Sequence, residues 1–129
     1  MSLAVVDASA VIALILGEPG AESVETIIAD CAITTVNLAE VVGYLARNGA
    51  AETAIREMVD ALRMETVPLD RELAYAVGVL LPATRVAGLS LGDRACLSLA
   101  HRRGVKAITT DRSWLRVART VGVEVEVIR

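Results

Sequence analysis

Short apolar runs alternate along the chain with longer stretches in which apolar residues recur every three or four positions. The short runs predict buried β-strands, and the spacing of three or four predicts amphipathic helices. The predicted strands cover residues 3–6, 31–35, 64–70, 105–110 and 123–128. The predicted helices cover residues 7 or 9 to about 17, about 21–29, 37–48, about 51–62, about 71–81, 89–104 and 111–122.

Residues that favour caps and breaks mark several of these helix ends. Asn48-Gly49 is typical of a helix C-terminus, and Pro82 is expected to break the fifth helix. Ser90 predicts the cap of the sixth helix, and Gly104 predicts its end. The pattern therefore predicts compact helices between short strands.

Strands that are separated by helices predict a parallel sheet, because parallel neighbours require crossover connections. These crossovers prefer one hand and place helices on the faces of the sheet. We therefore expect an α/β fold, a three-layer α/β/α sandwich whose central parallel sheet has about five strands. No linker, repeat or low-complexity segment divides residues 1–129, which predicts one domain.

Composition and cysteine usage narrow the class of protein. Hydrophobic residues make up 54% of the 129 residues, but no apolar run approaches the ~20 residues that a membrane helix needs. The N-terminus lacks the pattern of a signal peptide. Cys31 and Cys96 fit no zinc spacing and are expected to be buried thiols. These features predict a soluble cytoplasmic protein without a membrane partner.

The charge is unevenly distributed along the chain. Residues 1–72 contain 4 basic and 12 acidic side chains, whereas residues 73–129 contain 9 basic and 4 acidic ones. The second segment is therefore expected to project positive potential although the net charge is −3. This asymmetry favours binding to a polyanion.

Four acidic residues lie beside the predicted strands. Asp7 directly follows the first strand, and Asp111 follows the fourth. Glu40 lies five residues beyond "CAITT", in the predicted first turn of the next helix, and Asp93 lies in the first turn of the helix before the fourth strand. Ligands of open parallel sheets bind beyond the carboxyl ends of the strands. We therefore expect the four carboxylates to share a pocket at this edge.

Helix capping is an alternative explanation for each acid taken alone. Asp7 and Asp111 could cap the helices that follow them. Ser90 and Asp93 have the spacing of a capping box, and residues 37–40 nearly have it. Acidic side chains also suit helix N-termini because the helix dipole favours negative charge there.

Four carboxylates in one pocket would repel one another unless a cation lay among them. Mg²⁺ or Mn²⁺ suits an all-oxygen site, whereas a single histidine, His101, and unspaced cysteines argue against zinc. A divalent ion of this kind activates water for attack on phosphorus and offsets charge on the phosphoryl oxygens. The pattern therefore points to phosphodiester hydrolysis.

The segments that carry the acids resemble the four acidic motifs of the PIN domain family, specifically the VapC toxins of bacterial and archaeal toxin–antitoxin pairs. In chain order they are "VVDASAVIALIL", "NLAEVVGYL", "LSLGDRACLSLA" and "AITTDRSW". The resemblance covers essentially the whole chain. It implies that Asp7, Glu40, Asp93 and Asp111 are the catalytic and metal-binding quartet. It also places Ser9 and Thr110 where the family often has a hydroxyl near the acids.

The resemblance also implies a function and partners. VapC proteins are metal-dependent endoribonucleases that cut structured RNA, often tRNA or ribosomal RNA, and leave 5′-phosphate and 3′-hydroxyl ends. A VapB antitoxin holds them inactive, often by laying a segment across the surface and delivering an arginine to the acids. The family further implies a homodimer. The apolar helices predicted within residues 8–62 exceed what one small sheet needs, and we expect a groove there for another protein.

Arginines near the proposed site predict contacts to RNA. Arg112, Arg116 and Arg119 have helical spacing along one stripe, and Arg94 adjoins Asp93. Such a stripe could equally be a solvated helix face. With 2% aromatic residues, we expect recognition through RNA shape and backbone rather than base stacking. The alternative function is a non-catalytic PIN-fold module that binds RNA or a protein.

Overall fold

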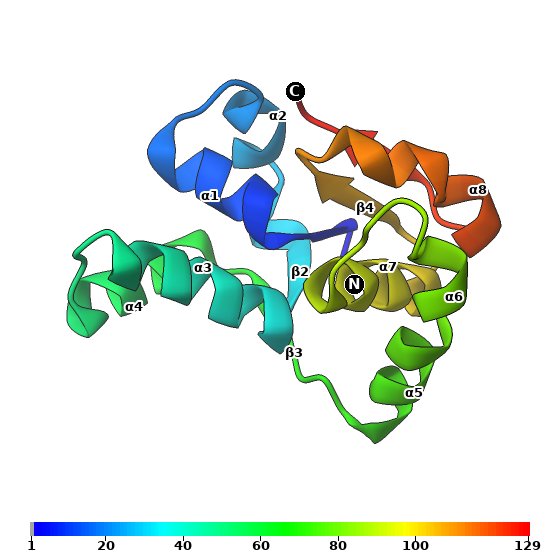
Figure 1. Cartoon of the computed structure of the whole chain (residues 1–129). Coiled ribbons are helices and arrows are strands. Elements are labelled where there is room, and N and C mark those ends of the chain that lie inside the picture. The colour runs from blue at the N-terminus through cyan, green and yellow to red at the C-terminus, as the bar shows by residue number, and fades with distance from the viewer. Residues whose placement is uncertain (1) are drawn as a thin grey trace.

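A computed structural model describes residues 2–129 and shows a five-stranded sheet between two layers of helices (Figure 1). The strand order is β3-β2-β1-β4-β5, and every neighbouring pair is parallel. The predicted three-layer α/β/α sandwich is therefore confirmed. The strands are β1 (Ala4–Val6), β2 (Cys31–Thr34), β3 (Glu65–Val67), β4 (Lys106–Thr109) and β5 (Val125–Val127).

Helices connect the strands and cover both faces of the sheet (Figure 1). The α-helices are α1 (Ala8–Leu16), α2 (Ala21–Glu25), α3 (Thr35–Arg47), α4 (Glu52–Leu62), α5 (Arg71–Val79), α6 (Leu81–Thr84), α7 (Leu91–Arg103) and α8 (Ala118–Val121). Two short 3₁₀ helices, η1 (Ile28–Asp30) and η2 (Arg112–Arg116), complete the order. No helix among residues 2–129 is long and apolar enough to cross a membrane.

Alternate residues of the central strand point into two separate cores, as the two-residue period of a strand requires. Val6 packs with α1, α3 and α4, whereas Val5 packs with α7 and the fully buried Trp114 of η2. Helix α5 lies outside α7, where Leu73 and Val77 pack against Ala95. Both faces of the sheet are therefore buried, which explains the small, branched composition of its strands.

Three helix boundaries differ from the sequence prediction. Helix α3 begins at Thr35 and is capped by Thr34, so the near capping box over residues 37–40 was wrong and Glu40 lies in the second turn. Helix α5 ends at Val79, so the predicted break before Pro82 is present, but a short helix, α6, follows at once. Pro82 lies in its first turn, where the missing N–H is not required. The predicted helix 111–122 is divided into η2 and α8 at Val117.

The strand order determines where a ligand can bind. The chain moves outward from β1 to β2 and β3 on one side, and then returns to place β4 and β5 on the other side. Connections therefore diverge between β1 and β4, which is the switch point at which open parallel sheets bind ligands. The backbone N–H of Asp7 donates to the Ile108 carbonyl across this point at 3.1 Å.

The amino edge of the sheet carries an ion pair instead. Arg103 Nη2 donates to Glu65 Oε2 at 2.8 Å, and Ser2 Oγ donates to Glu65 Oε1 at 2.7 Å. The hydrogen bond from Arg103 lowers the pKa of Glu65 to about 2. This network joins the beginning of the chain to β3 and α7, on the side opposite to the strand ends where Asp7 lies.

Candidate functional site

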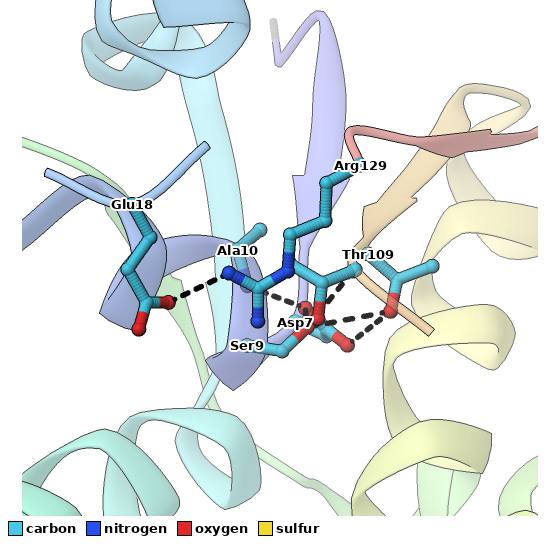
Figure 2. A network of polar contacts seen from close by, with 7 residues as sticks. Asp7, Ser9, Ala10, Glu18, Thr109 and Arg129 are labelled. Carbon is cyan, nitrogen blue, oxygen red and sulfur yellow. Dashed lines mark hydrogen bonds and ion pairs between the residues drawn. The ribbon is translucent and has the colours of Figure 1, made fainter. Parts of the chain in front are cut away.

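Asp7 lies at the carboxyl end of β1 and is the N-cap of α1 (Figure 2). The Ala10 backbone N–H and the Ser9 hydroxyl donate to its Oδ1 at 2.9 and 2.7 Å. The Thr109 hydroxyl, from the end of β4, donates to Oδ2 at 2.6 Å. Asp7 therefore caps a helix and also joins the two strands at the switch point.

The Asp7 carboxyl group is buried without a compensating cation. Its residue is only 4% exposed, and no ion pair within residues 2–129 includes it. Burial raises the pKa of Asp7 to about 6, although its three hydrogen bonds oppose the shift, and the charge of Asp93 adds to it. A carboxylate held in this way favours an incoming cation.

The hydroxyl groups around Asp7 are arranged differently from the sequence expectation. Ser9 contacts Asp7 directly, but the threonine hydroxyl on Asp7 belongs to Thr109 and not to Thr110. Thr110 contributes its backbone N–H, which donates to Ser9 Oγ at 3.0 Å. The reason is strand alternation: Thr109 is the last residue of β4, and its side chain points inward toward Asp7.

Glu40 is held at the edge of α3 by Asn37. Asn37 Nδ2 donates to Glu40 Oε1 at 2.9 Å and to the Gly92 carbonyl at 3.1 Å. The Thr34 hydroxyl in turn donates to Asn37 Oδ1 at 2.7 Å, so the orientation of the amide is fixed. Burial raises the pKa of Glu40, and the charge of Asp93 contributes. Asn37 therefore joins Glu40 of α3 to the first turn of α7.

Asp93 occupies the third position of α7 in a complete capping box with Ser90. The Ser90 backbone N–H donates to Asp93 Oδ2 at 2.8 Å, and the Asp93 N–H donates to Ser90 Oγ at 3.1 Å. Burial raises the pKa of Asp93, and the charge of Asp111 adds to this effect. Because its charge also raises the pKa values of Asp7 and Glu40, Asp93 is the acid that interacts with the other three.

Asp111, like Glu40, is exposed. Its Oδ1 accepts from the Ser113 N–H at 2.9 Å, which caps η2. Its own backbone N–H donates to Thr109 Oγ1 at 3.0 Å. The capping explanation is thus correct for Asp7, Asp93 and Asp111, and it does not conflict with a shared site.

All four acids line one cavity of about 490 Å³, together with Ser9 and Asn37. Three residues that follow Glu40 on α3 also line this cavity, namely Gly43, Tyr44 and Arg47. We call it the acid cavity. In the part of the chain that the structure describes, no three His, Cys, Asp or Glu side chains are close enough together to form a ready metal cluster. The acids therefore share a cavity without being in mutual contact.

The family profile of the PIN domain matches residues 4–120. The chain belongs to the PIN domain family. Among curated proteins, the comparison finds no match. Among solved structures, this PIN domain is 30% identical to a chain of VapBC-5, a member of the VapBC family of toxin–antitoxin systems from Mycobacterium tuberculosis. The two chains overlap over 98% of this one and 97% of that one, with a TM-score of 0.60.

More distant structures share the fold of this PIN domain. DNA-bound VapBC from Salmonella typhimurium is 18% identical, covers all of both chains and has a TM-score of 0.75. VapBC2 from Rickettsia felis, bound to a promoter DNA fragment, is 16% identical, covers 97% of this chain and 98% of that chain, and has a TM-score of 0.73. The resemblance to VapC-type toxins that the four motifs predicted is confirmed.

The arginines expected to contact RNA do not line the acid cavity of this PIN domain. Arg94 is turned away, because its Nη1 donates to the Val77 carbonyl of α5 at 3.0 Å. Arg112 donates to the Arg129 carbonyl at 3.2 Å. Arg116 and Arg119 are exposed, but they belong to η2 and α8 and not to one regular helix. Their contact with RNA stays a prediction.

Residues missed by the sequence interpretation complete the site. Arg47 lies seven residues after Glu40, two turns along the same face of α3, and this spacing could have identified it. Gly92 lies in the first turn of α7 between Ser90 and Asp93, where glycine weakens a helix. A Cβ atom at Gly92 would collide with the Glu40 carboxylate. The absence of a side chain at Gly92 therefore leaves room for the Glu40 carboxylate in its observed position.

Gly92→Ala tests this close approach. We expect the substitution to displace the flexible end of Glu40 and therefore to weaken Mn²⁺ binding about tenfold. Folding stability should be retained, because alanine favours a helix more than glycine does. Calorimetric titration with Mn²⁺ measures the affinity, and thermal unfolding measures the stability. Gly43→Ala is the matched control, since a Cβ atom there meets nothing within 4 Å. Equal Mn²⁺ affinity in both variants would contradict the assigned role of Gly92.

Proposed function

We propose that this PIN domain is a VapC-type toxin that acts as a divalent-metal-dependent endoribonuclease. The observation that carries the proposal is the convergence of Asp7, Glu40, Asp93 and Asp111 on one cavity at the switch point of the sheet. These acids come from four separate segments of the chain. Capping explains each one locally, but it does not explain why all four meet in one place.

The four acids fit Mg²⁺ or Mn²⁺. Their carboxylate oxygens are the ligands that these hard ions prefer, and the burial of Asp7, Asp93 and Glu40 disfavours their charges unless a cation is present. The spacing also fits, because Mg²⁺ usually binds through one or two carboxylates and keeps several waters. A loose set of acids serves such an ion better than a closed protein cage.

When bound, the ion would activate water and offset the charge of the phosphate during hydrolysis. The residues of the chain prepare the site for it. Ser9 and Thr109 hold both oxygens of Asp7 in place, and Asn37 orients Glu40. The capping box fixes one oxygen of Asp93. Rigid carboxylates of this kind reduce the reorganisation needed to bind the ion and the scissile phosphate.

The proposed protein partner is a VapB-like antitoxin. Several similar solved structures are VapBC toxin–antitoxin complexes. A second cavity of about 410 Å³ lies between α3 and α4, and Leu38, Val42, Ile55 and Val59 supply its apolar lining. A groove between two helices suits an inserted peptide segment. The homodimer that the resemblance implies stays a prediction.

Metal removal tests the proposed reaction against the alternative of a non-catalytic binding module. We expect purified protein to cleave RNA with Mn²⁺ or Mg²⁺, to lose cleavage in EDTA, and to recover it when Mn²⁺ is restored. The measurement is the appearance of RNA fragments with 5′-phosphate ends. RNA that binds but stays intact at every metal concentration would favour the binding module.

A further inference from the structure

Helix α3 contributes an aromatic and cationic pair to the lining of the acid cavity. The guanidinium carbon of Arg47 lies 5.5 Å from the centroid of the Tyr44 ring, which is within cation–π range. Both residues line the same cavity as the four acids. Among residues 2–129, no acidic side chain forms an ion pair with Arg47. We call these two residues the Tyr44–Arg47 pair.

Gly43 keeps the space between the acids and this pair open. Glycine is a poor residue for the interior of a helix, and Gly43 lies in the middle of α3. Nothing lies within 4 Å of the position that its Cβ atom would take, so packing within the chain does not require glycine. Gly43 lines the acid cavity beside Tyr44. The missing side chain therefore leaves room for a ligand that extends from the acids to the pair.

The composition of the cavity indicates the chemistry of this ligand. Arg47 is the only cationic residue, and Tyr44 the only aromatic one, among the described residues that line it. The chain has one other tyrosine, Tyr75 on α5, and its tryptophan is buried in the core. A ligand that offers a flat aromatic face and a negative charge close together matches this pair, and both are present in a nucleotide.

We propose that the Tyr44–Arg47 pair is a subsite for one unpaired nucleotide of the RNA substrate. Its base stacks on the ring of Tyr44, and Arg47 contacts its phosphate. The inference rests on the proposed ribonuclease function, since the scissile phosphate would lie at the acids. Residues 40 and 47 are about 10 Å apart along the helix axis, at 1.5 Å per residue. The subsite is therefore within reach of a nucleotide close to the cleaved bond.

This subsite selects unpaired RNA near the cleavage point. A base within a duplex is stacked on its neighbours and cannot also stack on a protein side chain. The sequence predicts recognition of RNA through its shape and backbone, and the proposed stacking of one base on Tyr44 is a local exception. Loops and single strands would bind here, whereas a blunt duplex would gain nothing from the ring.

The test compares Tyr44→Leu with Tyr44→Phe. Binding is measured by fluorescence anisotropy, with a labelled single-stranded oligoribonucleotide and the same strand in a duplex, in Ca²⁺ to neutralise the acids. Tyr44→Leu is expected to weaken single-strand binding about tenfold and to leave duplex binding unchanged. Tyr44→Phe, which keeps the ring, should match the wild type. Thermal unfolding verifies that each variant folds.

The chain offers a matched control pair at a distance from the acid cavity. The guanidinium carbon of Arg71 lies 5.8 Å from the centroid of Tyr75 on α5, and neither residue lines that cavity. Tyr75→Leu should leave single-strand binding unchanged. Arg47→Gln should reduce the slope of the logarithm of the binding constant against the logarithm of the salt concentration by about one, the value of one phosphate contact. Arg71→Gln should leave this slope unchanged.

The outcomes separate the subsite from the ribonuclease function. In Mn²⁺, Tyr44→Leu is expected to raise KM for single-stranded RNA about tenfold with little change in kcat. If the wild type cleaves RNA and Tyr44→Leu binds and cleaves it equally well, the proposed subsite is wrong and the proposed ribonuclease function still holds. Tyr44-dependent binding of RNA that is never cleaved would support the subsite and overturn the function.

Discussion

Asp93→Asn is expected to lower the rate of RNA cleavage by about three orders of magnitude while the protein remains folded. The charge of Asp93 acts on Asp7 and Glu40, and the charge of Asp111 acts on Asp93. Loss of the Asp93 charge therefore reduces the negative potential that the four acids together present to a cation. Asparagine keeps an oxygen that can accept from the Ser90 N–H, as the carboxylate does at 2.8 Å. Initial cleavage rates in Mn²⁺ and thermal unfolding are the measurements.

Ser90→Ala is the matched control for this variant. It removes the other half of the same capping box and leaves the Asp93 carboxylate in place. We expect a loss of about 1 kcal/mol in the free energy of unfolding and a rate within a few-fold of the wild type. If Ser90→Ala lost as much activity as Asp93→Asn, the helix cap and not the carboxylate charge would be the essential feature.

Asp7→Asn is expected to abolish cleavage and, in EDTA, to make the protein more stable at pH 8. The folded-state pKa of Asp7 is raised from 3.8 to about 6, mainly by burial. A raised carboxyl pKa destabilises the fold once the group must ionise, so this cost is absent below pH 4 and complete above pH 6. The shift corresponds to about 3 kcal/mol. Asparagine carries no charge and avoids this cost.

The measurement is denaturant unfolding of both proteins in EDTA between pH 4 and pH 8. The two curves should converge near pH 4 and separate as the pH rises, with Asp7→Asn the more stable. Asp70→Asn is the control, because Asp70 caps α5 by accepting from the Leu73 N–H at 2.8 Å but does not line the acid cavity. If the difference in free energy of unfolding between Asp7→Asn and the wild type did not change with pH, the charge of Asp7 would not destabilise the fold.

Metal should reverse the order of stability. Mn²⁺ stabilises only the form that binds it, by an amount that grows with its concentration above the dissociation constant. The wild type should therefore gain stability in Mn²⁺, whereas Asp7→Asn should gain little. This comparison links the electrostatic cost at Asp7 to the proposed role of the site.

The architecture and the meeting of the acids were predictable from local features. Apolar runs bounded by turn residues identified the strands, and the rule for parallel sheets placed Asp7 and Asp111 at one edge. Other features depend on distances between helices that no single segment encodes. The contact of Gly92 with Glu40 is one example, and the hydrogen bond from Thr109 to Asp7 is another.

The direction in which a side chain points was a second feature that the sequence alone did not predict. Arg94 adjoins Asp93 in the sequence, but successive helix positions are about 100° apart, so Arg94 points toward α5 while Asp93 faces the cavity. Arg47 is distant from every acid except Glu40 in the sequence, yet it shares their cavity. Helical spacing, which places Arg47 two turns after Glu40, was therefore a better guide than adjacency in the sequence to which arginine accompanies the acids.

The parallel sheet places Ser2 and Arg129 at opposite edges. Ser2 is joined to Glu65 at the amino edge. Arg129 follows β5 at the carboxyl edge, where its guanidinium pairs with Glu18 at 2.9 Å (Figure 2) and its carbonyl accepts from Arg112. A bulky label attached at Arg129 would therefore lie on the side of the proposed RNA site. A label attached at Ser2 would leave that side clear and is the better choice for cleavage assays.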